Sequence, residues 1–99
     1  MITSITVLTV PKENKGKFIS MCEELVKKTR EEEGCIDFDI YEDVEKDTEV
    51  AFIERWKDVR AIEIHCQMEF FGRIVPKIME LCEGDPILAE KYKECYPVK

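Results

Sequence analysis

Three segments of the chain show the alternation of apolar and polar residues that is typical of β-strands. Residues 2–10 are rich in Ile, Val and Thr, and Pro11 ends this segment because it lacks the N–H that a sheet requires. Residues 35–43 and 49–57 alternate on either side of a polar turn. They therefore form a predicted hairpin with a loop of about five residues.

Alternation within residues 35–43 assigns their side chains to opposite faces of the predicted sheet. Ile36 and Phe38 point to one face, together with Ile40. Tyr41 points to the other face, together with two aspartates, and its hydroxyl could reach either a pocket or water.

Apolar residues at spacings of three and four predict a helix in the first half of the chain. Asn14 is its expected N-cap, and Gly34 is expected to adopt the left-handed conformation that follows a helix end. The stretch KKTREEE before Gly34 is interpreted as a solvated helix end. The apolar face consists of Phe18, Cys22, Leu25, Val26 and Thr29.

A second helical region follows the hairpin, and Asp58 is its expected cap. Its apolar stripe consists of Val59, Ile62 and Cys66. A further amphipathic helix follows, in which Pro76 either introduces a kink or begins a new first turn. The apolar face of this helix consists of Phe70, Phe71, Ile74, Ile78, Met79 and Cys82.

The stretch EGDP is expected to break the chain, and residues 87–96 are interpreted as a final strand. The resulting order is the βαββαβ pattern of the ferredoxin-like fold, an α+β class. Its antiparallel sheet carries both helical regions on one face. Residues 1–99 are expected to form one domain, because about 100 residues is a common domain size.

The first strand is apolar on both of its faces, with Ile5 and Val7 on one side and Leu8 on the other. The helices cover only one face, so the second face needs another cover. A second copy of the chain is the simplest cover, and two packed sheets would enclose an apolar core with a cavity in each subunit. The pattern therefore predicts a homodimer that binds a small molecule.

A net charge of −7 argues against binding to nucleic acids, which needs a basic surface, and against attraction to anionic membranes. No apolar run approaches the ~20 residues of a membrane span. The start MITSITVLTVPK lacks the charged region of a signal peptide, so a cytoplasmic location is expected.

The chain has five cysteines and no C-x-x-C pair, so neither a zinc nor an iron–sulfur site is supported. In the cytosol they would be reduced thiols that serve mostly as packing residues. Whether one of them is reactive stays open. The cysteines are Cys22, Cys35, Cys66, Cys82 and Cys95.

Three stretches carry a shared signature: ITVLTVPKENKGKFISM, GCIDFDIYED and FIERWKDVRAIEIHCQMEFF. The signature is Glu54-x-Trp56, followed by Ala61, His65 and Phe71. In these stretches the chain resembles the antibiotic biosynthesis monooxygenase (ABM) family. The signature is moderately specific for the family and poorly specific for one reaction.

The resemblance implies a dimeric α+β barrel. Members of the family include cofactor-independent monooxygenases of quinols and aromatic polyketides, heme-degrading monooxygenases, and an isomerase of a phosphorylated signalling sugar. By this resemblance, Glu54 and His65 match polar positions of the pocket, and Trp56 matches its apolar wall. The full set of expected substrate-binding residues is Trp56, Phe71, Phe38 and Tyr41.

The heme-degrading branch uses an asparagine on the first strand and a histidine in the second helical region. The matching positions hold Thr6 and Val75 in this chain. With no axial ligand at Val75, the resemblance argues against heme degradation. His65 is no replacement, because it lies about ten residues earlier, where that branch has a tryptophan.

The side chains allow a catalytic and a purely structural interpretation. Imidazole titrates near neutral pH, so His65 could accept the proton of a phenol or an enol. Glu54 and Trp56 face the same side of their strand, where the carboxylate could orient His65 or hold a substrate hydroxyl. Alternatively, His65 and Glu54 close the strand–helix corner with a hydrogen bond, and Trp56 is a packing residue.

Three functions therefore stay open. The first is a cofactor-independent monooxygenase of a quinol or a similar small aromatic, with His65 as the base and Glu54 as its partner. The second is a non-enzymatic dimer that binds a small apolar ligand. The third is an isomerase that enolises a small signalling metabolite through the same two residues without oxygen. No metal and no other cofactor is expected.

Overall fold

The structure is a computed structural model that describes the backbone of residues 1–95 and, apart from residues 85–89, their side chains. In chain order, the elements are β1 (Ile2–Thr9), the 3₁₀ turn η1 (Lys12–Asn14), α1 (Lys15–Arg30), β2 (Cys35–Glu42), β3 (Glu49–Trp56), α2 (Val59–Cys66), α3 (Glu69–Met79) and β4 (Glu83–Lys93).

The four strands form one sheet in the order β2-β3-β1-β4, and each neighbouring pair is antiparallel. The predicted α+β, ferredoxin-like fold class is therefore confirmed. In this register, Glu54 of β3 pairs with Ser4 of β1 on one side and with Phe38 of β2 on the other. Paired residues project to the same face, so these three side chains form one row across the sheet.

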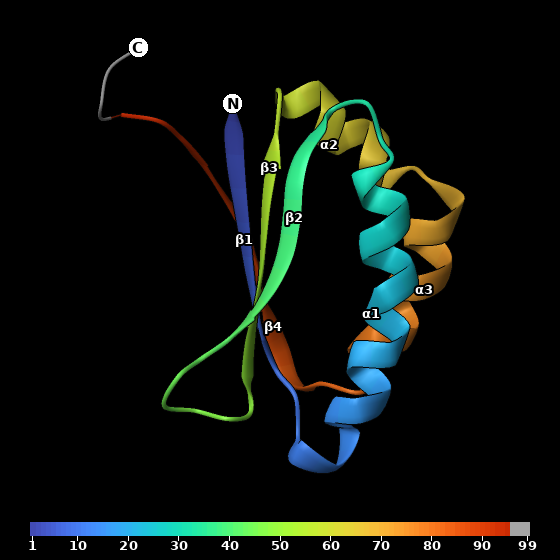
Figure 1. Ribbon diagram of the computed structural model, residues 1–99, viewed down its shortest axis with the longest axis vertical. Coiled ribbons are helices and arrows are strands. Elements are labelled where there is room, and N and C mark those ends of the chain that lie inside the picture. Colours follow the sequence, from blue (N-terminus) through green and yellow to red (C-terminus); the bar gives the residue numbers. More distant parts are fainter. Residues whose placement is uncertain (96–99) are drawn as a thin grey trace.

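The helices α1, α2 and α3 lie on one face of the sheet, and no helix of the described residues covers the other face (Figure 1). α1 and α3 run side by side along the sheet, whereas the short α2 sits near the end of β3. Within the described part of the chain, none of the helices is long and apolar enough to span a membrane.

The hydrophobic core lies between the sheet and the helices. Phe52 of β3 contacts Phe18 of α1 and Phe38 of β2, with ring centroids 6.0 and 5.6 Å apart. A smaller cluster joins Trp56 to Ala61 and Ile62 of α2. The main core consists of Leu8, Val10, Phe18, Cys22, Leu25, Phe38, Val50, Phe52, Phe70, Ile74 and Ile78.

Gly34 is required for space and not for its backbone conformation. Within the described residues, Gly84 has the one positive φ, 65°, so the left-handed conformation predicted for Gly34 is wrong. A Cβ atom on Gly34 would lie 2.3 Å from the Cβ of Ala61. The glycine therefore lets α2 approach the turn that follows α1.

The two predicted helix caps have different outcomes. Asp58 caps α2, because its Oδ1 accepts a hydrogen bond from the Ala61 N–H at 2.8 Å. Asn14 stands at the N-cap position of α1, but its side chain makes no capping hydrogen bond. Its Nδ2 instead donates to the Leu81 carbonyl at 3.1 Å, which ties the start of α1 to the end of α3.

The buried face of α2 differs from the prediction. Ala61, Ile62 and His65 are buried, whereas Val59 and Cys66 are exposed. This face of α2 is buried because it packs against the Trp56 ring. The apolar face predicted for α3 is confirmed at Phe70, Ile74 and Ile78, and this helix continues through Pro76 to Met79.

Ile36 does not share the burial of Phe38, contrary to the prediction from strict alternation. The pairing of β2 with β3 shifts between Cys35 and Asp37, so Ile36 is an extra residue in the strand. Its side chain is half exposed, whereas Phe38 is buried.

The last strand begins earlier than predicted. β4 spans Glu83–Lys93, so the EGDP stretch belongs to it and does not break the chain. Two shifts in its pairing with β1 accommodate this irregular sequence. Residue 96, which was included in the predicted strand, lies outside the described residues.

Candidate active site

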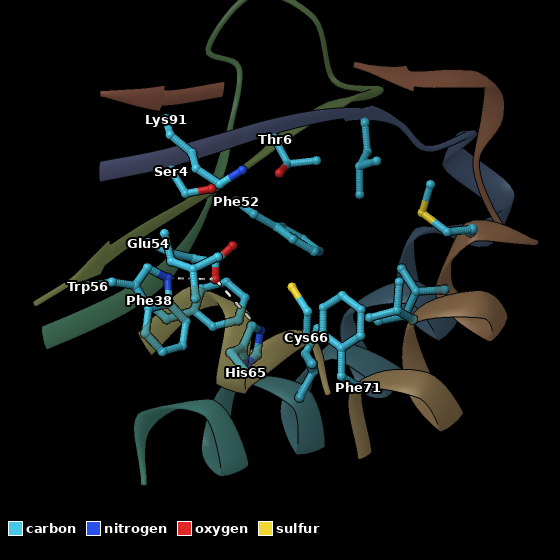
Figure 2. Close-up of a pocket in the computed structure, with 16 residues that line it drawn as sticks. Ser4, Thr6, Phe38, Phe52, Glu54, Trp56, His65, Cys66, Phe71 and Lys91 are labelled. Atoms are coloured by element: carbon cyan, nitrogen blue, oxygen red, sulfur yellow. Dashed lines mark hydrogen bonds and ion pairs between the residues drawn. The ribbon is translucent and has the colours of Figure 1, made fainter. Parts of the chain in front are cut away.

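A cavity of about 270 Å³ lies between the sheet and the helices (Figure 2). Side chains from β1, β2, β3 and β4 form one wall, and side chains from α1, α2 and α3 form the other. The cavity thus lies on the helix-covered face of a single chain. The sequence pattern predicted a cavity in the core between two packed sheets, whereas this cavity lies between the sheet and the helices.

Five of the six predicted site residues line this cavity, and Tyr41 does not. Tyr41 pairs with Ala51 on the opposite face of the sheet, and it is 51% exposed. The alternation that turns the Phe38 ring inward turns the Tyr41 ring outward, so Tyr41 lies outside this cavity. The five residues in the wall are His65, Glu54, Trp56, Phe71 and Phe38.

His65 contacts the carboxylate of Glu32, a residue of the KKTREEE stretch that was predicted to be solvated. Oε2 of Glu32 lies 2.5 Å from Nδ1 of His65, and the two side chains are only 8% and 6% exposed. Glu32 donates its N–H to the Thr29 carbonyl at 3.0 Å, and its own carbonyl accepts from Cys35 at 3.1 Å. This turn directs the carboxylate toward α2, so KKTREEE is not merely a solvated end.

A sequence signal for Glu32 exists in the buried stripe of α1. Phe18, Cys22, Leu25 and Thr29 follow one another at spacings of four, three and four, and a further step of three reaches Glu32. The stripe thus continues two residues past the end of α1 at Arg30, where a carboxylate replaces an apolar residue.

The contact with Glu32 determines which imidazole nitrogen faces the cavity as an acceptor. In the neutral imidazole, Nδ1 of His65 therefore carries the hydrogen that the Glu32 carboxylate accepts. Nε2 of His65 is then the basic nitrogen. It lies 3.9 Å from Oε1 of Glu54, so the two groups adjoin the same space without a direct hydrogen bond.

Glu54 is a buried carboxylate on the sheet wall, with its side chain 13% exposed. The indole Nε1 of Trp56 donates to its Oε1 at 3.3 Å. Burial raises the pKa of Glu54; the neighbouring His65 and the indole hydrogen bond oppose that rise, and the charge of Glu32 adds to it. A raised pKa favours the protonated carboxyl, which is able to donate a hydrogen bond as well as accept one.

Aromatic rings enclose the imidazole of His65. The Trp56 ring lies 4.7 Å from it between centroids, and the Phe71 ring lies 5.0 Å away in an edge-to-face arrangement. Phe70 adds a third ring at 6.0 Å. These contacts hold the imidazole in place and keep water from its sides.

Polar side chains also reach the cavity from its sheet wall, which faces His65 across the cavity. Figure 2 shows Ser4, Thr6 and Lys91 on this wall and Cys66 beside His65. Burial raises the pKa of the Cys66 thiol, so it is not a preformed thiolate. Burial also raises the pKa of Cys22 to about 12 and that of Cys35 to about 11.

The two positions that correspond to the heme-degrading branch both lie in the cavity wall. Thr6 and Val75 line it, and neither a hydroxyl nor an isopropyl group is an axial ligand for heme iron. These two positions therefore supply no ligand for heme iron. Within the described part of the chain, no group of three or more His, Cys, Asp or Glu side chains is arranged to hold a metal ion.

Comparison with known sequences identifies relatives across most of the chain. The profile of the family described as antibiotic biosynthesis monooxygenase matches residues 1–77. A Bacillus subtilis (strain 168) protein, provisionally named monooxygenase YcnE, is 32% identical over 81 residues, which cover 82% of this chain and 85% of that protein. An uncharacterized Synechocystis protein, sll1783, is 31% identical over 74 residues, 75% of this chain; they span only 50% of that protein.

Solved structures share the fold. A conserved protein from Methanosarcina mazei Go1 has a TM-score of 0.91 at 26% identity, covering 95% of this chain and 92% of that chain. A crystal structure of an antibiotic biosynthesis monooxygenase has a TM-score of 0.88 at 30% identity, covering 96% of this chain and 99% of that chain.

Proposed function

The chain belongs to the antibiotic biosynthesis monooxygenase (ABM) family, and we propose that it is a cofactor-independent monooxygenase that oxidises a quinol or a similar small aromatic compound. One observation carries this proposal. The buried Glu32–His65 pair leaves Nε2 as a base beside a mostly apolar cavity of a size that suits a small ligand.

The first step is the transfer of a substrate hydroxyl proton to Nε2 of His65. The imidazolium that forms is stabilised by the Glu32 carboxylate at Nδ1, as in other histidine–carboxylate pairs. The electron-rich substrate anion then passes an electron to molecular oxygen. Overall, one oxygen atom enters the substrate and the other leaves as water, and the substrate supplies the two electrons and two hydrogens for that water.

Glu54 acts on the substrate in this proposal. Its raised pKa favours a carboxyl that donates a hydrogen bond to a substrate oxygen as negative charge develops there. Trp56 holds the carboxyl through its indole N–H. Phe38, Trp56 and Phe71 supply the apolar wall that orients an aromatic ring and limits water.

The bare face of the sheet supports a homodimer. Ile5 pairs with Ile53, and Val7 pairs with Ala51, so apolar side chains run across β1 and β3 on the face without helices. A second sheet packed on this face would remove these side chains from water. We expect this dimer to be cytosolic.

Oxygen uptake with a panel of hydroquinones tests the proposed function. Uptake above the autoxidation blank, lost in a folded His65→Ala variant, is the expected result. Equal rates with protein and blank across the panel would contradict the proposal.

The same residues would also support an isomerase that enolises its substrate, because Nε2 of His65 and the Glu54 carboxyl adjoin one space at 3.9 Å. Such a reaction needs a base and an acid but no oxygen. Turnover under strictly anaerobic conditions would favour the isomerase over the monooxygenase. Binding without any turnover would favour the non-enzymatic ligand-binding dimer.

A further inference from the structure

Among the described residues that line the cavity, Lys91 is the one lysine or arginine. It lies on β4 and pairs with Ser4 of β1, so both side chains project toward the helices. Figure 2 shows the ammonium nitrogen of Lys91 near Ser4 and Thr6, across the cavity from His65.

The ammonium of Lys91 has no ion-pair or hydrogen-bond partner within the described part of the chain. Several other lysines are paired, such as Lys12 with Asp47 and Lys28 with Glu24. Lys91 is exposed, so it stands where the cavity meets solvent. A cation at that place is available to a ligand without the full cost of desolvation.

Two carboxylates lie next to His65, and one of them, Glu54, lines the cavity two strands away from Lys91. Glu32 and Glu54 both adjoin His65, at 2.5 and 3.9 Å. The Glu32 carboxylate disfavours a negative group of a ligand beside His65, whereas the ammonium of Lys91 attracts such a group.

We propose that the ligand is a small hydroxylated aromatic compound that also carries one carboxylate, and that Lys91 binds this carboxylate while the hydroxyl faces His65. This inference rests on the proposed function, because it assumes that the cavity binds a hydroxylated ring. A single ammonium suits one carboxylate, whereas a phosphate dianion calls for a larger set of cations or backbone N–H groups. The ring of the ligand lies between Lys91 and His65, against Phe38, Phe52 and Phe71.

Binding measured without oxygen tests this orientation. The probes are hydroquinone, homogentisate (the same ring with an acetate group) and the neutral amide of homogentisate. Calorimetric titration of the full chain is expected to show homogentisate binding about tenfold tighter than the amide, as for one charge-assisted hydrogen bond. This preference should shrink as salt is added.

Variants assign the preference to one side chain. Lys91→Met should bind the acid and the amide equally, and Lys91→Arg should restore the preference for the acid. Lys93→Met is the matched control, because Lys93 lies on the same strand and pairs with Ile2 but does not line the cavity. Its preference should equal that of the unmodified protein.

Two outcomes would overturn the inference and leave the proposed function standing. They are equal binding of acid and amide by the unmodified protein, and a preference that persists in Lys91→Met. If the protein binds hydroquinone and neither derivative, the carboxylated ligand class is also wrong. If it binds none of the three, the quinol assignment fails together with this inference.

Discussion

Nδ1 of His65 and Oε2 of Glu32 are 2.5 Å apart in a site that excludes most water, although 33 positions separate the two residues in the chain. This pair sets the direction of the imidazole. Its Nε2 nitrogen faces the cavity because the other nitrogen is engaged. The candidate site is therefore a carboxylate–histidine pair plus a second carboxyl, and not the two-residue site that the sequence indicated.

Replacing Glu32 with Gln should lower kcat about 100-fold while KM changes little, because the imidazolium loses its carboxylate partner. Nitrogen-15 chemical shifts of the His65 ring should show a mixture of tautomers in place of one. Glu33→Gln is the matched control, since the neighbouring carboxylate is 94% exposed. A kcat unchanged in Glu32→Gln would remove Glu32 from the proposed mechanism.

Replacing Glu54 with Gln should stabilise the protein at neutral pH, because the amide avoids the cost of burying a charged carboxylate. The pKa of Glu54 is raised in the folded state, so its favourable contribution is complete below the unfolded pKa near 4.5 and is lost as pH rises through the folded pKa. The difference between the two proteins should vanish below about pH 4.

Urea unfolding at several pH values measures this difference. Glu23→Gln, on the exposed face of α1, should show no comparable pH dependence. A Glu54→Gln variant that is less stable than the parent at pH 7 would mean that the charged form is favoured in the folded protein.

Replacing Gly34 with Ala should destabilise the protein by about 2 kcal/mol, because the new methyl group overlaps the Cβ of Ala61. The double variant with Ala61→Gly should recover part of this loss. Gly16→Ala is the control, since a Cβ there has no neighbour within 4 Å and should stabilise α1. Additive losses in the double variant would show that the two residues do not clash.

Replacing Ile5 with Arg should convert the proposed dimer into monomers, because it places a charge at the centre of the bare sheet face. Its partner across the sheet, Ile53, should give the same result when replaced. Sedimentation velocity measures the change. Val44→Arg, in the exposed turn between β2 and β3, should leave the oligomeric state unaltered. A parent protein that sediments as a monomer would contradict the dimer.

Local sequence patterns predicted much of the fold correctly. The strands β1, β2 and β3 begin at the predicted residues and end within one residue of the predicted ends, and the buried face of α1 is the predicted one. These features depend on periodicity and on Asp58, whose capping contact is three residues away in the chain. Such interactions are visible in a sequence because they repeat within a few residues.

The sequence by itself determined the ferredoxin-like fold and the residues His65, Glu54 and Trp56 as neighbours at a strand–helix corner. Only the tertiary structure decided that Glu32 binds the histidine, that Lys91 reaches the cavity and that Tyr41 does not. Periodicity tells which side of an element is buried, but it does not tell which distant element packs against that side. The site is assembled from β1, β3, β4, α2 and the turn after α1, so its partners became evident only when these segments were packed together.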